Sequence, residues 1–268
     1  MKHEDPIHQL TDSPIHQLQS ALEARHLANL TRSEAARALR ALSSCYVERR
    51  TKLASGAPLE TAGKRAAFAL YYAVLHYAIV SEIVRASGLA TQTTGTIHDL
   101  GCGTGVGGAA WALQCRSRPA VAGVDRSAWA VDEANWLYRH LRLEGRAVRG
   151  DFSHALRRRG RSLTAGDALL FAYALNEAPP SVRAETLGSV IAAVERHAPV
   201  LIVEPIGKRL GNAGWWHEWR TALAPYAIVE REWRFPATLL PESTRDLAKA
   251  AGLDPKELTA RTLASAGG

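Results

Sequence analysis

A glycine-rich turn with a carboxylate just before it is the stretch of this chain best suited to chemistry. Residues 96–108 read Thr-Ile-His-Asp-Leu-Gly-Cys-Gly-Thr-Gly-Val-Gly-Gly, so Asp99 ends a short β-branched and apolar run. Glycine permits positive φ values and lets backbone N–H groups approach a ligand closely at the start of a helix. Asp99 would add a carboxylate beside that ligand. We therefore expect a small-molecule site where a strand turns into a helix.

The Asp-Leu-Gly-Cys-Gly-Thr-Gly sequence of residues 99–105 resembles motif I of the class I S-adenosylmethionine-dependent methyltransferases. This resemblance implies an enzyme that binds S-adenosylmethionine in a Rossmann-like seven-stranded α/β sheet. It also implies that the methionine end of the cofactor is held by Asp99, Gly101, Cys102, Gly103 and Gly105. The small size of Cys102 explains its place in the turn, and no catalytic thiol is expected there.

A dinucleotide site is the main alternative to this interpretation. Gly103, Gly105 and Gly108 satisfy G-x-G-x-x-G, and Asp125 lies 24 residues after Gly101, near the ~20 typical of a ribose-binding acid. However, a carboxylate at position 99 would repel a pyrophosphate, whereas it suits a sulfonium cofactor with a cationic amino group. A coincidental glycine-rich turn is the third interpretation.

Two further carboxylates follow the next two expected strands. Asp125, with Arg126 beside it, could accept hydrogen bonds from both ribose hydroxyls of the cofactor, or it could cap the following helix. Asp151 and Phe152 occupy the place where members of the superfamily usually contact the adenine amino group and flank its ring. Asp151 could equally be a helix cap. We predict that all four residues bind the cofactor.

The fourth expected strand leads into Tyr173, Asn176 and Glu177, the candidates for substrate contact and catalysis, and Tyr173 is also a candidate for cofactor binding. Methyl transfer is a direct displacement, in which the protein aligns the nucleophile and, where needed, removes a proton. Glu177 could be that base, or it could cap the helix that starts at Pro179-Pro180. Asn176 is not followed by Pro-Pro-Tyr or Pro-Pro-Phe, and no pair of loop cysteines is present. Both absences disfavour the usual routes to methylated nucleobases.

Aromatic and basic clusters supply further candidates for substrate binding. Three tryptophans, Trp215, Trp216 and Trp219, cannot all lie on one helix face, so we expect at least one to face a cleft. They could form a stacking platform, or they could pack in the core. The basic loop of residues 157–161 is either solvated or a phosphate contact. Our candidates for substrate binding are Tyr71, Tyr72, Glu204, Trp215 and Trp216.

Three segments together resemble the mitochondrial-type small-ribosomal-subunit methyltransferase family and its bacterial relatives. They are the helix ending at Tyr77–Val80, the Tyr173–Glu177 step, and Val203-Glu-Pro205 with Arg220 downstream. The resemblance spans roughly residues 60–225 and implies ribosomal RNA as the substrate. The mitochondrial members carry a cysteine cluster associated with an iron–sulfur centre, but here Ile206 replaces a glycine and no cysteine follows Cys115. We therefore expect a bacterial branch with no metal site.

Two other functions stay open beside methylation of RNA. One is a small-molecule methyltransferase that acts on an oxygen or nitrogen atom of a natural product or metabolite. The other is a ribosome assembly factor that binds the cofactor without turnover. The motifs for cofactor binding would be the same in all three.

The elements that position these residues follow from hydrophobic periodicity. A helical region is expected up to about residue 90, with a helix from Ser13-Pro14, a capping box at Thr31–Glu34 and a long helix over 61–86. Alternating strands and helices follow, with strands near 96–100, 120–125, 146–150, 167–172 and 199–204. Intervening helices are expected near 106–115, 127–143, 152–160 and 180–197. A helix near 212–223 and a strand pair near 226–235 would complete the sheet, and the rest would be helical and then frayed.

We accordingly divide the chain into an N-terminal arm and helical region (1–90), a Rossmann-like cofactor-binding domain (91–240) and a C-terminal tail (241–268). Its 268 residues carry 33 Lys and Arg against 26 Asp and Glu, a net charge of +7 that favours polyanionic partners such as RNA. Three scattered cysteines fit a reducing compartment. The apolar run from Ala66 to Val80 is shorter than the ~20 residues of a membrane span. We expect a cytoplasmic protein without a membrane partner.

Overall fold

The computed structural model describes residues 13–48, 59–159, 162–206 and 213–266, and the chain forms two compact units. The helical unit comprises Met1–Ala78 and Phe235–Leu258, and the sheet unit comprises Ile79–Arg234 and Thr259–Gly268. All the candidate residues for the cofactor site belong to the sheet unit. Tyr71 and Tyr72 belong to the helical unit.

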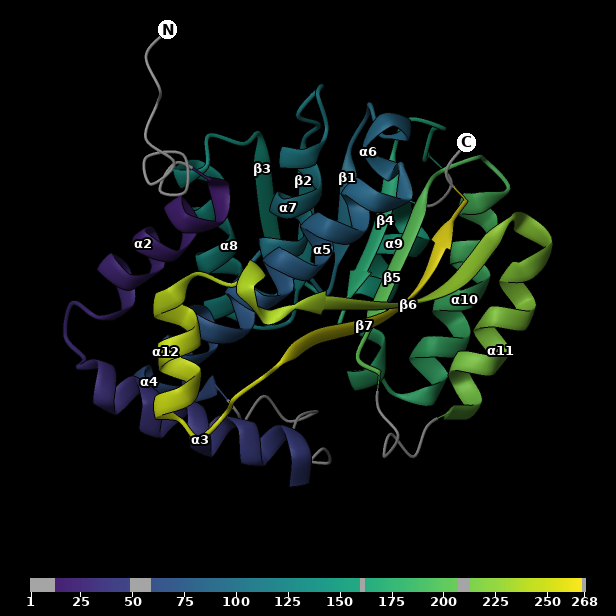
Figure 1. The fold of residues 1–268 in the computed structure, drawn as a ribbon. Coiled ribbons are helices and arrows are strands. Elements are labelled where there is room, and N and C mark those ends of the chain that lie inside the picture. The colour runs from purple at the N-terminus through teal and green to yellow at the C-terminus, as the bar shows by residue number, and fades with distance from the viewer. Residues whose placement is uncertain (1–12, 49–58, 160–161, 207–212, 267–268) are drawn as a thin grey trace, which may run out of the picture. The chain divides into compact units, whose positions relative to one another are not determined.

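The sheet has seven strands in the order β3-β2-β1-β4-β5-β7-β6 (Figure 1). The bounds are β1 Ile97–Leu100, β2 Val121–Asp125, β3 Gly145–Arg149, β4 Ala168–Ala172, β5 Val200–Glu204, β6 Ile228–Pro236 and β7 Glu257–Ser265. The first five strands pair in parallel, whereas β7 pairs antiparallel with β5. This confirms the prediction of a Rossmann-like α/β sheet of the methyltransferase type, preceded by a helical region.

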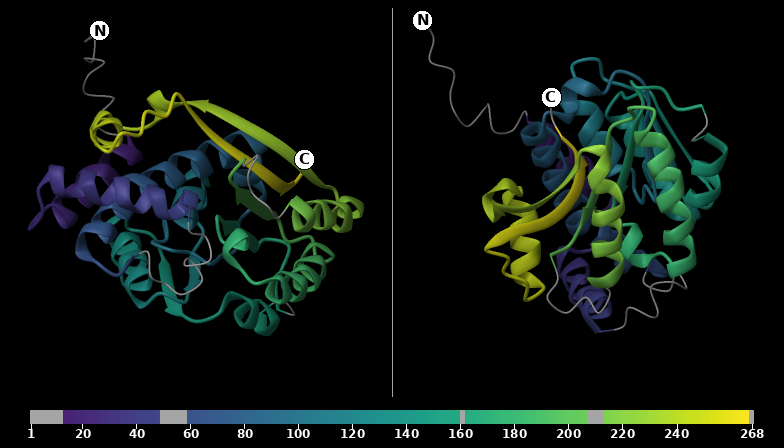
Figure 2. Two further views of the ribbon diagram at one scale, coloured as in Figure 1. Left: turned by 90° about the horizontal axis from the view of Figure 1, so that it is seen from below. Right: turned by 90° about the vertical axis from the view of Figure 1, so that its right-hand side faces the viewer.

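Helices cover both faces of this sheet. On one face, α7 (Val106–Gln114) contacts β1, β2 and β4, and α8 (Ala128–His140) contacts β2 and β3. The other face holds a hydrophobic core that includes Leu169, Phe171 and Ile202. Its helices are α9 (Phe152–Arg159), α10 (Pro180–Val194) and α11 (Ala213–Leu223), of which α10 and α11 lie side by side (Figure 2). Short helices η4 (Leu175–Glu177) and η5 (Ala224–Tyr226) complete the connections.

The strand order reverses between β1 and β4, which are neighbours although β2 and β3 separate them in sequence. In open parallel sheets, ligands bind outside the carboxyl ends of the strands at such a reversal. The glycine-rich turn leaves β1 at this point, and Tyr173 follows β4 at the same point. The topology therefore brings together the two segments that the sequence marks most strongly.

The helical unit contains α2 (Pro14–His26), α3 (Arg32–Glu48), α4 (Ala62–Ala67), the π-helical turn η3 (Phe68–Ala73), the first residues of α5 (Val74–Ser87), η6 (Ala237–Leu239) and α12 (Glu242–Ala250). The predicted capping box is confirmed, because Glu34 N donates to Thr31 Oγ1 at 3.2 Å and Thr31 N donates to Glu34 Oε2 at 2.8 Å. Arg40 Nε donates to Ala251 O at 3.0 Å, which ties α3 to the end of α12.

The segment from Ala62 to Ser87 is a continuous helical stretch, with the π-helical turn in its middle. By length and composition it could cross a membrane, but 67% of its most apolar window is buried within the protein. Such burial is typical of a core helix. After Ser87, α6 (Leu89–Gln92) leads into β1.

The predicted strands β1 to β5 and the helices between them are confirmed to within a few residues. The expectation for the C-terminal part is wrong in two respects. Residues 228–236 form one strand rather than a pair, and residues 257–265 form β7 rather than a frayed end. The signal of β7 is weak because its buried positions include Ala260, Thr262 and Ala264, small or polar side chains that are covered only when the strand lies between β5 and β6. The sequence Ser-Gly-Ala-Pro at residues 55–58 also predicts a break before the long helix, and this segment lies outside the described residues.

Candidate functional site

The glycine-rich turn is held against the end of β2 and the turn after β4. Gly101 N and Cys102 N both donate to Val124 O, at 2.9 and 3.0 Å. Gly101 has φ +77°, and a Cβ at this position would lie 2.6 Å from Ala174 Cβ. Only glycine therefore allows the turn to meet the segment after β4 so closely.

An open space lies over Gly103, at the centre of the turn. Gly103 has φ +51°, and a Cβ built on it would meet no atom within 4 Å. Its N–H donates to Asp125 Oδ2 at 2.9 Å, which fixes the turn to the end of β2. A glycine whose missing side chain would enter open space is suited to close approach by a ligand. The residues present thus fit a bound cofactor at this position.

Asp99 is buried beneath the turn, with 1% of its surface exposed. Its Oδ2 accepts from Gly108 N at 2.8 Å. Glycine permits this close approach because it lacks a Cβ, which at position 108 would lie only 2.9 Å from the same oxygen. Among the described residues, Oδ1 has no hydrogen-bond partner. Burial raises the pKa of Asp99 to about 7, with a further contribution from the charge of Asp125, although the bond from Gly108 opposes the shift.

Asp125 anchors backbone on both sides of β2. While Oδ2 accepts from Gly103, Oδ1 accepts from Ser127 N at 2.8 Å. The N-cap of α8 is Ser127, whose Oγ accepts from Ala130 N at 3.3 Å. Ser127, and not Asp125, therefore caps this helix. Arg126 is exposed, and its carbonyl accepts from Arg149 Nε at 3.1 Å.

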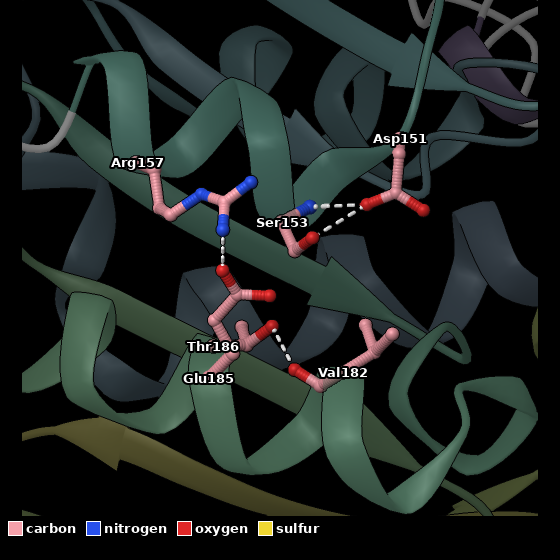
Figure 3. Close-up of polar contacts among 6 residues, drawn as sticks. All are labelled: Asp151, Ser153, Arg157, Val182, Glu185 and Thr186. Atoms are coloured by element: carbon pink, nitrogen blue, oxygen red, sulfur yellow. Dashed lines mark hydrogen bonds and ion pairs between the residues drawn. The ribbon is translucent and has the colours of Figure 1, made fainter.

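Asp151 caps α9, as Figure 3 shows: its Oδ1 accepts from Ser153 N at 2.9 Å and from Ser153 Oγ at 2.7 Å. Partial burial would raise the pKa of Asp151, but these bonds and the charge of Arg126 outweigh it and lower the pKa. Phe152 is buried against Phe171, with ring centroids 5.8 Å apart. Its Cδ1 nevertheless lies 3.7 Å from the Cβ position of Gly101. The cap is thus present, and the contact of both residues with adenine stays a prediction.

Tyr173 occupies a left-handed backbone conformation at the end of β4. Its φ is +61°, and its N–H donates to Val203 O at 2.8 Å. A bulky residue in this region is strained, and such strain is concentrated at functional sites. Burial and the neighbouring charge of Glu204 raise the pKa of Tyr173. The phenol therefore stays protonated at neutral pH.

Asn176 and Glu177 lie on η4. Asn176 N donates to Glu204 Oε1 at 3.0 Å, while Asn176 Nδ2 is buried without a partner among the described residues. Glu177 is exposed. The N-cap of α10 is Pro179, whose side chain makes no capping hydrogen bond, and the capping alternative for Glu177 stays a prediction.

Glu204 is completely buried at the end of β5. Burial raises its pKa to about 8, while the backbone of Asn176 and Leu175 and the charge of Arg261 oppose the shift. Its Oε2 has no hydrogen-bond partner among the described residues. The antiparallel register places Arg261 of β7 directly opposite.

Two arginines that sequence reasoning missed surround Glu204. Arg183 of α10 is 5% exposed, and its Nη1 donates to the carbonyls of Leu175 and Ala178. The guanidinium of Arg261 lies 4.1 Å from the centroid of the Trp216 ring, and that of Arg183 lies 5.4 Å from that of Trp215. No local motif marks either arginine, because only the packing of α10 and the register of β7 bring them to Glu204.

The three tryptophans of α11 are all buried: Trp215 is 7% exposed, Trp216 4% and Trp219 1%. They pack edge to face around Trp215 and belong to the hydrophobic core. The expectation that at least one faces a cleft is therefore wrong, and core packing is the better interpretation. Trp216 Nε1 donates to Glu230 Oε1 at 2.6 Å.

Tyr138 of α8 is a third residue that the sequence did not mark. It is fully buried, and its ring lies 2.9 Å from the Cβ position of Gly105 and 2.7 Å from that of Gly145. Both glycines let the ring pack beneath the turn. Cys102 is also buried, and burial raises the pKa of its thiol well above the usual value. An unreactive thiol agrees with the expectation that Cys102 is not a nucleophile.

The remaining candidates give mixed results. Tyr71 is buried and Tyr72 half-buried, with ring centroids 5.1 Å apart; their role in substrate binding stays a prediction. Arg157, the first residue of the predicted basic loop, lies on α9 instead and forms an ion pair with Glu185 on α10 (Figure 3). Residues 160 and 161 lie outside the described part. In the described ranges, no three His, Cys, Asp or Glu side chains are arranged to hold a metal ion.

No family of known sequences matches this chain, and no curated protein is significantly similar to it. Among solved structures, it is similar to a TehB-like SAM-dependent methyltransferase from Corynebacterium glutamicum (18% identity, TM-score 0.43, covering 84% of this chain and 98% of that one). It is also similar to the plantazolicin methyltransferase BamL in complex with SAH (10% identity, TM-score 0.44, covering 87% of this chain and 97% of that one). A third similar structure is that of Aeropyrum pernix fibrillarin with S-adenosyl-L-methionine (13% identity, TM-score 0.44, covering 70% of this chain and 76% of that one). The fold assignment itself rests on the order and directions of the strands.

Proposed function

We propose that this protein is an S-adenosylmethionine-dependent methyltransferase that binds its cofactor at the carboxyl ends of β1, β2 and β3. The observation that carries the proposal is the open space over Gly103, in a turn fixed by Asp125 and adjoining the buried carboxylate of Asp99. The resemblance of residues 99–105 to motif I supports the same cofactor. Strand ends at a reversal of strand order are where such a ligand binds.

Each residue has a distinct role in this proposal. The turn from Gly101 to Gly105 holds the methionine end, with Asp99 supplying negative charge next to a cationic amino group and sulfonium. Asp125 accepts from the ribose, and Asp151 with Phe152 faces the adenine. When bound, S-adenosylmethionine supplies an activated methyl group.

The dinucleotide alternative is less well supported. A pyrophosphate would lie near the N-terminus of α7, within reach of the Asp99 carboxylate that α7 covers. At a pH above about 7, Asp99 is mostly ionised, so it would repel that group.

The acceptor end of the site lies at β4 and β5 in this proposal. Tyr173 carries a strained backbone and a protonated hydroxyl, which suits orientation of a substrate by a hydrogen bond rather than proton removal. Glu177 is exposed and is the better candidate for a general base when the acceptor needs one.

Calorimetry with S-adenosylmethionine tests the proposal. We expect micromolar binding to the native protein and a loss of at least tenfold in Asp125→Ala, because the variant lacks both the ribose acceptor and the anchor of Gly103 N. The control is Asp132→Ala, which removes an exposed carboxylate from α8 and should bind like the native protein. Absence of binding to the native protein, or equal losses in both variants, would contradict the proposal.

Methylation of RNA is the second candidate for the reaction, favoured by exposed arginines around the edge strand β3. Among them are Arg126, Arg139, Arg142, Arg146 and Arg149. Exposed arginines contact phosphates, and such binding weakens steeply with salt. We expect a folded ribosomal RNA fragment to bind the native protein with an affinity that falls as salt rises. The slope of the logarithm of affinity against the logarithm of salt concentration should be smaller in magnitude by roughly two in Arg146→Gln/Arg149→Gln. A slope unchanged in this variant would favour a small-molecule substrate.

A further inference from the structure

Unpaired polar atoms gather at the carboxyl ends of β4 and β5, beyond the region assigned to the cofactor. Among the described residues, these atoms include four unpaired donors, Arg183 Nε, Arg261 Nε, Asn176 Nδ2 and Trp215 Nε1, and one unpaired acceptor, Glu204 Oε2. Buried polar atoms are almost always hydrogen-bonded in folded proteins. We refer to these five side chains as the polar cluster.

Several contacts show that the polar cluster is continuous. Asn176 N donates to Glu204 Oε1 at 3.0 Å, and Arg261 pairs with Glu204 across the strands. The guanidinium of Arg183 lies over Trp215, and the Trp215 and Trp216 ring centroids are 5.5 Å apart. Arg261 in turn lies over Trp216. These contacts run without a break from Arg183 through Trp215, Trp216 and Arg261 to Glu204 and Asn176.

The cluster has an excess of unpaired donors, because among the described residues four unpaired N–H donors accompany one unpaired oxygen. Acids also lie near the two guanidinium groups: Glu204 and the exposed Glu218 near Arg183, and Glu204, Glu230 and the exposed Glu232 near Arg261. Of these, Glu230 already accepts from Trp216 and Arg220. A ligand that satisfies the unpaired donors must bring oxygen acceptors. Guanidinium groups bind carboxylate and phosphate oxygens with charge-assisted hydrogen bonds.

We propose that the polar cluster is a subsite for an oxyanion, a carboxylate or phosphate group carried by the methyl acceptor. This proposal rests on the proposed function, since it makes the cluster the part of the site that holds the substrate. Asn176 and Arg261 are half-buried, so an oxyanion reaches the cluster from their side. Tyr173 follows β4, the strand that lies between β1, which leads into the glycine-rich turn, and β5, which ends at Glu204. Its hydroxyl would orient the acceptor atom.

Calorimetric titration of the full chain with sodium phosphate and, separately, with sodium benzoate tests the subsite at constant ionic strength. We expect at least one of the two anions to bind, and to bind at least tenfold more weakly to Arg261→Gln. Binding of benzoate alone would assign a carboxylate, and binding of phosphate alone a phosphate group. Arg261→Lys keeps the charge but loses the planar donor, so it should lie between the native protein and Arg261→Gln.

The matched control is Arg196→Gln, which removes an exposed arginine from the end of the α10 segment; Arg196 Nη1 donates to Ala192 O at 2.8 Å. This variant should bind the anions like the native protein. The proposal is overturned if neither anion binds, or if Arg196→Gln weakens binding as much as Arg261→Gln does. Titration of the same proteins with S-adenosylmethionine separates the two proposals: intact cofactor binding without anion binding rejects the subsite alone, and the reverse rejects the cofactor site alone.

Discussion

Replacing Gly103 by leucine is expected to weaken S-adenosylmethionine binding by at least 100-fold while the protein stays folded. A Cβ at this position meets no neighbouring atom within 4 Å, so the leucine side chain would enter the space that we assign to the cofactor. The backbone is left-handed there, with φ +51°, which costs a non-glycine residue about 1–2 kcal/mol. Calorimetry and urea unfolding measure the two effects separately.

Gly252→Leu is the matched control for backbone strain. Gly252 follows α12 in the helical unit with φ +79°, and a Cβ there would lie no closer than 3.8 Å to any neighbour. It should lose about the same stability as Gly103→Leu and keep its affinity for the cofactor. Equal affinities for the cofactor in the two variants would show that the space over Gly103 is not part of the site.

Asp99→Asn is expected to change how stability depends on pH. The pKa of Asp99 is about 7 in the folded protein and near 4 in the unfolded chain, so the folded state holds this proton more tightly. The stability of the native protein therefore falls as pH rises from about 4 to 7, by up to roughly 4 kcal/mol from this group, and does not recover above pH 7. The amide does not titrate, so the variant should lack this fall.

Urea unfolding at pH 5 and pH 8 measures the difference. Glu204, whose folded pKa is about 8, contributes a fall of the same sign, so Asp99→Asn should reduce the slope and Asp99→Asn/Glu204→Gln should nearly remove it. Asp151→Asn is the control: the pKa of Asp151 is lowered on folding, so this carboxyl is ionised in both the folded and the unfolded protein between pH 5 and pH 8, and the variant should keep the native slope. Native and Asp99→Asn proteins with identical slopes would contradict the assignment of the buried charge.

The raised pKa of Asp99 also has a meaning for function. A carboxylate buried with one oxygen unpaired destabilises the protein without a ligand, and a cationic ligand beside it would offset this cost. In the proposed function, cofactor binding therefore favours the ionised form of Asp99. The asparagine variant would gain stability above pH 7 at the expense of this interaction.

The local sequence was sufficient to predict the elements whose signals lie within a few residues. Thr31 and Glu34 form their capping box because each side chain bonds a backbone group three residues away. The glycines of the turn after β1 mark a positive φ value at position 101 and close packing at positions 101 and 108. Strand β4 is a continuous apolar run, and β5 is apolar up to Glu204, since central parallel strands are covered on both faces.

Elements whose burial depends on distant neighbours were not predictable in this way. The strand Glu257–Ser265 contains small and polar residues that are buried only by insertion between β5 and β6. The tryptophans of α11 form a cluster too broad for one helix face, yet the sheet and α10 cover all three. A helical periodicity alone does not tell how many neighbours a helix has.

The sequence by itself determined the Rossmann-like sheet, the turn from Asp99 to Gly105 and the carboxylates at the ends of β2 and β3, because each is a local pattern of backbone geometry and hydrophobicity. Only the tertiary structure decided which residues surround Glu204. Arg183 comes from α10 and Arg261 from β7, and the side chains meet through helix packing and strand register. Contacts between residues far apart in sequence leave no local pattern, since either arginine alone is compatible with an ordinary exposed helix or strand.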